Sequence, residues 1–174
     1  GLGGAIYIYN SRGVHFLKCR FENNFADQGG GVYIKSSGGV SEDDIMFENC
    51  ILWNNTAQYG GGAIYSYGAT LQTTHLTTMS NHTEDAQGDG IHLHDSVLDI
   101  SHSIWWQESG STSQNTEIFV NESSSYTEGN NSNLIEFNPL FINPSIGDFH
   151  LQEGSPCIGN PDMGAYGGIN GIWE

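Results

Sequence analysis

Aromatic and histidine side chains recur at alternating positions in five short segments, and this spacing could build a contact surface. In each segment they alternate with apolar residues, a period of two that is typical of a β-strand. Alternate side chains of a strand point to the same face, so the residues between the apolar positions form two outward rows. The first row comprises Tyr7, Tyr33, Tyr65, His92 and Phe119. The second row comprises Tyr9, Lys35, Tyr67, His94 and Asn121.

These rows allow three interpretations. Aromatic rings offer a large contact area and lose little conformational entropy, so the rows could bind sugar rings or a partner protein. Alternatively, stacked rings only stabilise neighbouring strands, each pair by about 0.2–1 kcal/mol. A third possibility is that long loops cover the face. We expect the contact face to comprise Tyr7, Tyr9, Tyr33, Tyr65, Tyr67, His92 and Phe119.

Metal binding is the next chemistry to consider, because His92 and His94 point to one face of a single segment. Two residues apart in a strand, they lie about 6.8 Å from each other. A shared ion would need a further ligand, such as Tyr65 or Asp95. Surface histidines without a metal are the commoner explanation, so we predict no metal and no cofactor.

Catalysis is the remaining chemistry, and here the charged residues argue against it. A lyase acting on acidic polysaccharides needs a Lys or Arg near the substrate. The chain has only four Lys and Arg residues, and all of them lie within residues 12–35. The acidic run 42–44 has no partners at the repeat spacing. A hydrolase needs two carboxylates facing one cleft, to which Asp89, Asp95 and Asp99 could contribute. We predict no catalytic residues and keep a carbohydrate-active enzyme as the alternative.

The elements that carry these side chains form a repeat. The first apolar residues of the five segments are separated by 26, 32, 27 and 27 positions. They are Ile6, Val32, Ile64, Ile91 and Ile118. A fixed period of this length indicates a repeat architecture, and frequent Gly, Asn and Thr exclude helical repeats. We predict an all-β, right-handed parallel β-helix of about five coils, with the glycine clusters forming its corners.

Alternation also places a second apolar row inside the coils, and matching positions in the middle of each repeat should stack as well. The second inward row comprises Ile8, Ile34, Ser66, Leu93 and Val120. Cys19 and Cys50 match one coil apart, where they form either a disulfide or two small core residues. Asn24 and Asn55 match too, and could form an amide ladder at a turn.

The repeats resemble a known family. The peptides "GGAI" (3–6 and 61–64) and "FENN" (21–24) resemble the repeats of chlamydial polymorphic outer-membrane proteins, which are secreted β-helix adhesins. Residues 138–168 resemble the closing segment of many large bacterial β-helix surface proteins. The resemblance implies an extracellular right-handed β-helix and no single activity. We therefore divide the chain into coils (1–137) and a closing segment (138–174) of the same domain.

Composition limits the partners. The formal net charge is −16, which argues against binding to DNA, RNA or an anionic membrane surface. No apolar run approaches the roughly 20 residues needed to cross a bilayer, so we expect no membrane insertion. The chain begins inside a repeat, and an open coil edge can recruit another strand. Expected partners are copies stacked end to end, neighbouring repeats of a longer protein, or glycans.

These observations favour one functional hypothesis over two others. The first is a non-catalytic extracellular β-helix at the cell surface that acts through contacts, as an adhesive module or a filament subunit. The others are the carbohydrate-active enzyme and a sugar-binding module that uses the tyrosines.

Overall fold

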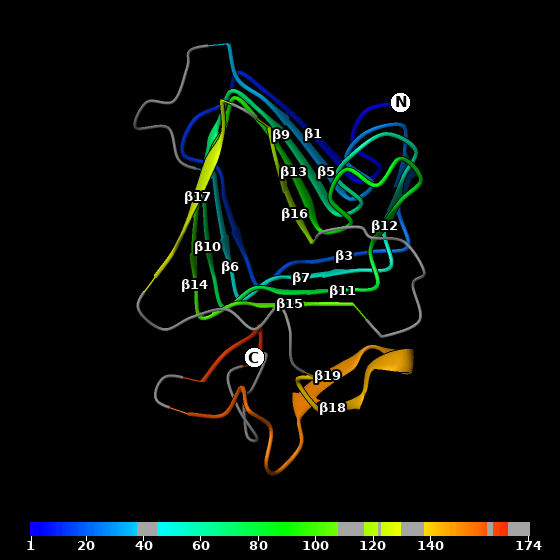
Figure 1. Ribbon diagram of the computed structural model, residues 1–174, viewed down its shortest axis with the longest axis vertical. Coiled ribbons are helices and arrows are strands. Elements are labelled where there is room, and N and C mark those ends of the chain that lie inside the picture. Colours follow the sequence, from blue (N-terminus) through cyan, green and yellow to red (C-terminus); the bar gives the residue numbers. More distant parts are fainter. Residues whose placement is uncertain (38–44, 108–116, 122, 130–137, 160–161, 167–174) are drawn as a thin grey trace.

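The computed structural model describes residues 1–37, 45–107, 117–121, 123–129, 138–159 and 162–166. The chain winds in triangular coils, as the view along the stack in Figure 1 shows. Four coils contribute a strand to each of three long sheets, and a fifth contributes strands to two of them. Every strand pair in these sheets is parallel. The predicted all-β parallel solenoid is therefore confirmed.

Each side of the triangle is one sheet, and the strands of a sheet come from successive coils. The first sheet is β1 (Ile6–Tyr9), β5 (Val32–Lys35), β9 (Ile64–Tyr67), β13 (Ile91–His94) and β16 (Ile118–Val120). The second is β2 (His15–Leu17), β6 (Ile45–Glu48), β10 (Thr70–Thr74), β14 (Val97–Ser101) and β17 (Ser125–Glu128). The third is β3 (Arg20–Glu22), β7 (Ile51–Trp53), β11 (Thr77–Met79) and β15 (Ile104–Trp106). A short fourth sheet is β4 (Phe25–Ala26), β8 (Thr56–Ala57) and β12 (His82–Thr83).

The core fills the inside of the triangle, and the register of the first sheet matches the predicted inward rows. Ile6 pairs with Val32, Val32 with Ile64, and Ile64 with Ile91, which also pairs with Ile118. The inward positions of the three middle strands are fully or almost fully buried. The single polar member, Ser66, shares a 2.9 Å hydrogen bond between its hydroxyl and that of Ser96.

The corners are built in two ways, and only the glycine corners were located from the sequence. Before the first sheet, successive coils turn on glycines with left-handed φ angles of 62–80°, which glycine adopts without a steric penalty. These are Gly3, Gly29, Gly61 and Gly88. The corners after the second sheet and after the third sheet turn on single non-glycine residues with φ of 47–58°. These are Lys18, Asn23, Asn49, Asn54, His75, Ser80 and His102. Short polar side chains tolerate this conformation best, so asparagine marks these corners more often than glycine does.

Matching residues form ladders, as expected from the sequence. Asn24 Nδ2 donates to Asn55 Oδ1, and Asn55 Nδ2 donates to Asn81 Oδ1, each at 2.9 Å. The ladder thus continues one coil beyond the pair identified in the sequence. Cys19 and Cys50 are neighbours, but both are free thiols, and the Cys19 N–H donates to Cys50 Sγ at 3.4 Å.

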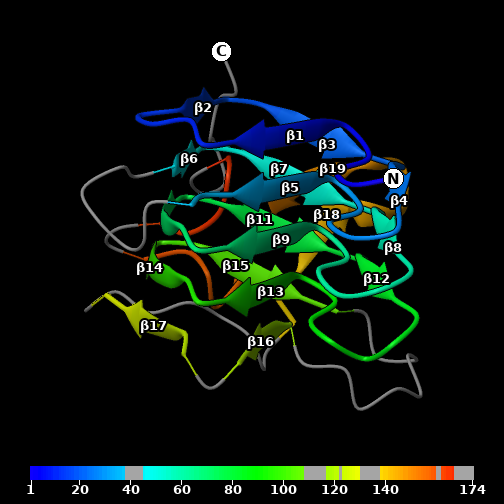
Figure 2. The same ribbon diagram turned by 90° about the horizontal axis from the view of Figure 1, so that it is seen from above.

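The C-terminal segment forms a hairpin of β18 (Phe141–Asn143), a 3-10 turn (Pro144–Ile146) and β19 (Asp148–Leu151). Figures 1 and 2 place the hairpin beside the third sheet, along the flank of the stack. Its buried side chains pack on the outer face of that sheet, where Ile51, Met79 and Ile104 lie. The described part of the closing segment therefore covers a side of the solenoid. No helix in the described ranges has the length and apolarity to cross a membrane.

Candidate contact face on the first sheet

The two outward rows predicted from the sequence exist on the first sheet. Tyr7 pairs with Tyr33, Tyr33 with Tyr65, and Tyr65 with His92. Tyr67 pairs with His94 in the second row, which runs beside the first. Because the strands are parallel and in register, each row advances by one coil, about 4.8 Å, at a time.

The first row is largely closed, which corrects the expectation of an open face. Tyr33, Tyr65 and His92 are only 5%, 7% and 5% exposed. The glycine-rich segments that precede the strands lie over this row. A Cβ atom added at Gly60 would come within 2.5 Å of His92 Nδ1 and 3.2 Å of Tyr65 Cε2. The Gly60 N–H donates to Thr83 Oγ1 and to Asp85 Oδ1, both at 3.0 Å, which holds this cover in place.

Burial changes the ionisation of the covered side chains. Loss of solvent raises the pKa of Tyr65 to about 12, and the neighbouring Tyr33 adds to the effect. Burial lowers the pKa of His92 to about 4, with a further contribution from His94. Both side chains are therefore neutral at physiological pH.

The exposed part of the face is the second row together with the first coil. Tyr7 and Tyr9 are 48% and 54% exposed, whereas Tyr67 and His94 are half-buried. Lys35 lies between the two tyrosines of the second row, with Nζ 5.5 Å from the centre of the Tyr67 ring. Phe119 of the fifth coil is also half-buried.

Ring stacking decides what the exposed row can bind. The Tyr67 and His94 rings lie 4.7 Å apart and 23° from parallel, and the Tyr33 and Tyr65 rings lie 5.2 Å apart and 6° from parallel. These spacings are close to the coil spacing, so the ring faces contact one another along the stack. In the second row, the stacked Tyr67 and His94 therefore present ring edges, a hydroxyl group and an imidazole to solvent. Such a surface recognises partners by hydrogen bonds and edge contacts more than by stacking on sugar rings.

On this face, the described histidines and carboxylates considered for metal binding or catalysis are not gathered at one point. The His92 and His94 rings are 6.4 Å apart, and His94 lies against the adjacent Asp95, with 3.5 Å between Nε2 and Oδ2. Among the described residues, no three His, Cys, Asp or Glu side chains are placed to hold a metal ion. Asp89 lies at the corner before β13, Asp95 lies at the corner after β13, and Asp99 lies on β14 of the second sheet. The fold therefore separates the three carboxylates. The acidic run 42–44 falls outside the described residues.

One cluster of buried acidic residues was not predicted from the sequence. Asp89 and Glu117 are buried together before the fourth and fifth strands of the first sheet. Aligning the repeats by their first apolar residue would have revealed them, because earlier coils have glycine or alanine there.

Three comparisons with known proteins bear on this architecture. Residues 18–35 and 54–67 match the Chlamydia polymorphic membrane protein repeat. The searches of curated proteins and of solved structures gave no match. The two matching segments contain the FENN peptide and the second GGAI peptide. The resemblance predicted from these peptides is therefore confirmed by a repeat that belongs to membrane proteins of Chlamydia.

Proposed function

We propose that this chain is a non-catalytic, adhesive module of a bacterial surface protein, in which the solenoid holds a row of side chains for contact with a partner. The repeat match supports a surface location, since the repeat belongs to a family of membrane proteins. The observation that carries the adhesive role is the exposed row at the first sheet, with Tyr9, Lys35 and Tyr67 in consecutive coils.

The shape of the face favours a protein or glycan partner that is recognised by hydrogen bonds. A parallel solenoid changes little on binding, because each coil is fixed by backbone bonds to its neighbours. Little conformational entropy is therefore lost, and even modest side-chain contacts yield binding energy. A repeated row also allows several contacts at once along an extended partner.

An adhesion assay tests this proposal. Beads coated with the protein would be incubated with epithelial cells, and bound beads would be counted for the native chain and for Tyr9→Ala with Tyr67→Ala. We expect at least a tenfold loss for the double variant. Tyr126→Ala, which removes an exposed tyrosine from β17 on another side, is the matched control. Equal binding by the native chain and the double variant would contradict the proposal.

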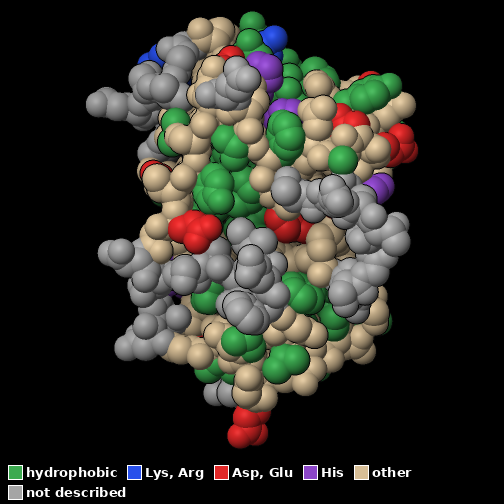
Figure 3. Space-filling view, viewed as in Figure 1, with side chains coloured by type: hydrophobic (Ala, Val, Ile, Leu, Met, Phe, Trp, Pro, Cys, Tyr) green, Lys and Arg blue, Asp and Glu red, His purple; other side chains and the backbone are tan. Residues whose placement is uncertain are grey.

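End-to-end contact between copies is a second candidate, supported by an uneven distribution of charge and apolar surface. All four Lys and Arg residues lie within positions 12–35, whereas 14 of the 20 acidic residues lie at or after Glu84. Figure 3 looks down the stack at one end of the molecule, where acidic side chains are visible and Lys and Arg appear only at the upper margin. The first coil also exposes Leu2, Leu17 and Phe25. The more basic end of one copy is therefore complementary in charge to the more acidic end of another copy, or of a neighbouring repeat in a longer protein.

Electron microscopy in negative stain, over a range of salt concentrations, tests this second candidate. Threads of constant width are expected, and they should become shorter in Phe25→Ser, which removes an exposed apolar side chain from the first coil. Ile142→Ser removes an exposed side chain from the C-terminal hairpin and serves as the control. Separate short particles at every salt concentration would exclude stacking and leave the adhesive proposal untouched.

A further inference from the structure

The corner before the first sheet changes its chemistry along the solenoid. Two positions before the strand, successive coils have Gly4, Gly30 and Gly62, but the fourth has Asp89. One position before the strand, the fifth coil has Glu117 where earlier coils have only glycine or alanine. Both acidic side chains are buried, with Asp89 at 1% and Glu117 at 7% exposure.

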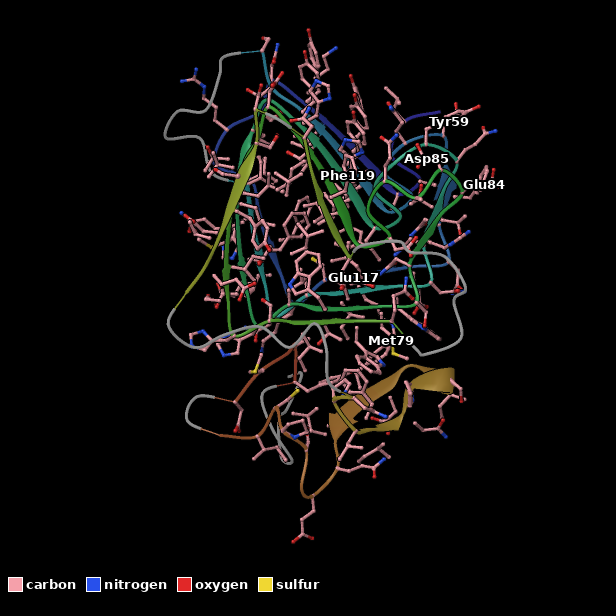
Figure 4. The ribbon with its side chains drawn as sticks, viewed as in Figure 1. Tyr59, Met79, Glu84, Asp85, Glu117 and Phe119 are labelled. Atoms are coloured by element: carbon pink, nitrogen blue, oxygen red, sulfur yellow. The ribbon has the colours of Figure 1, made fainter. Side chains whose placement is uncertain are left out.

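Glu117 occupies space that the neighbouring coil leaves open. A Cβ atom added at Gly90 would lie 2.6 Å from Glu117 Oε2 and 3.0 Å from Trp105 Cε3. The Glu117 carboxyl and the Trp105 ring therefore meet at the site of the missing side chain. Figure 4 shows Glu117 at the start of β16 on the inner side of the triangle, whereas Tyr59 and Asp85 lie on the outer side.

Within the described part of the chain, the groups that act on Glu117 include no Lys or Arg side chain. Asp89 faces it from the segment before β13, and next to Asp89 lies His82 of β12, with 3.5 Å between His82 Nδ1 and Asp89 Oδ1. The third sheet contributes the neutral side chains of Thr78 and Trp105, which are neighbours across β11 and β15. The sequence has no Lys or Arg after Lys35. Two buried carboxylates repel each other, and the nearby imidazole of His82 lies against Asp89, so the pair favours a neutral Glu117.

The structure favours Glu117 as the group that is neutralised. Asp89 Oδ1 accepts a 2.7 Å hydrogen bond from the Thr83 N–H, which stabilises a carboxylate. Glu117 Oε1 and Asp89 Oδ2 both lack a hydrogen-bond partner within the described part of the chain, so the Thr83 N–H bond to Asp89 Oδ1 is what distinguishes the two carboxyl groups. Burial and, secondarily, the charge of Asp89 raise the pKa of Glu117 to about 8, against the opposing effect of Thr78. With no set of three metal-ligating side chains among the described residues, a proton is the neutralising partner.

We propose that Glu117 is a proton-dependent latch for the last strand of the first sheet: with its proton, β16 closes on β13, and without it β16 loosens. Strand β16 has three residues and, within the described ranges, pairs with β13 alone. The backbone carbonyl of Glu117 accepts a 2.7 Å hydrogen bond from the Ile91 N–H, so the latch residue lies in the ladder that it controls. Opening would free the edge of β13, a surface able to pair with another strand. Mild acid thus closes this end of the solenoid and mild alkali opens it.

Hydrogen exchange by mass spectrometry tests the latch. Peptides covering β16 and β9 would be followed from pH 5 to pH 9 after correction for the intrinsic rate. The folded-state pKa of Glu117, about 8, lies above its ordinary value of 4.5. Protonated Glu117 therefore stabilises the closure of β16 fully below pH 4.5. This stabilisation falls as the pH rises from 4.5 to about 8. We expect the protection of β16 to fall about tenfold per pH unit and to level off above about pH 8, while β9 stays protected.

Three variants make the result decisive. Glu117→Gln should keep β16 protected at every pH, because the amide mimics the protonated carboxyl. Asp99→Asn, which neutralises an exposed carboxylate on β14, should retain the native slope. His82→Gln should retain it as well. A slope that disappears with His82→Gln and persists with Glu117→Gln would overturn the proposal, and so would a native protein whose β16 protection is independent of pH.

Discussion

The first three coils and the described parts of the last two contribute strands to the same sheets but fill their corners differently. In the first three coils the residue two positions before the strand is glycine, and backbones of adjacent coils come into close contact there. In the last two coils the same corner contains the buried side chains of Asp89 and Glu117. Both segments that match the family repeat, 18–35 and 54–67, lie in the regular part. The regular positions thus define the path of the backbone, and departures from them introduce ionisable groups.

Replacing a corner glycine should have the largest effect on the regular part. A Cβ atom at Gly30 would collide with the carbonyl oxygen of Gly62 and lie 2.5 Å from that of Thr56. Backbone atoms of two coils cannot move aside easily, so Gly30→Ala should lower the free energy of unfolding by about 3 kcal/mol or more. Urea denaturation followed by circular dichroism measures this change.

Gly159→Ala is the matched control for this glycine. A Cβ atom added at Gly159 would have none of the described atoms within 4 Å, and the φ angle of Gly159 is not left-handed. Its replacement should change stability by less than about 0.5 kcal/mol. Equal losses for the two variants would mean that close approach is not what requires glycine at the corner.

The glycine corner also shows what the sequence could predict. The period of two and the repeat spacing predicted the sheet, the inward rows and their register, because a parallel stack repeats each environment once per coil. The individual residues that turn the other corners escaped prediction, since Asn49, His75 and Ser80 are ordinary polar residues in sequence and become left-handed only in the fold. The alternation of apolar and polar residues predicted that the Tyr33 and Tyr65 side chains point outward. Their burial depends instead on segments from other coils. Such contacts have no local signal.

The C-terminal hairpin gives a second example of this limit. Its motifs predicted a closing segment, yet the surface that its described part covers is the flank of the third sheet. Arg20 of β3 donates from Nη1 to the Gly147 carbonyl at 3.1 Å, and its guanidinium lies 5.1 Å from the centre of the Trp53 ring. Arg20 and Gly147 are separated by 127 positions in the sequence. Outward apolar residues such as Ile51 indicate in the sequence that another segment covers this face of the third sheet. They do not indicate which segment covers it.

The asparagine ladder offers a further test of the regular coils, with a somewhat smaller expected effect. Asn55 Nδ2 donates to the Phe21 carbonyl and to Asn81 Oδ1, both at 2.9 Å, inside the protein. Asn55→Ala leaves these acceptors buried without their donor, at a cost of about 3 kcal/mol in the free energy of unfolding. Asn54→Gly removes an exposed bond to Asn23 and keeps the left-handed corner, so thermal melting should detect a much smaller change. A ladder that mattered little would give both variants the same melting temperature.

The smallest expected effects distinguish the two outward rows of the first sheet. Tyr65 is buried between Tyr33 and His92, so Tyr65→Ala should lower the free energy of unfolding by about 2 kcal/mol. Tyr67 is half-buried and stacks on His94, so Tyr67→Ala should cost only about 0.5 kcal/mol. Urea midpoints measured beside bead adhesion would separate the roles of the rows. If Tyr67→Ala lowers adhesion at nearly native stability, the second row is a binding surface; if stability and adhesion fall together in both variants, the rings only support the coils.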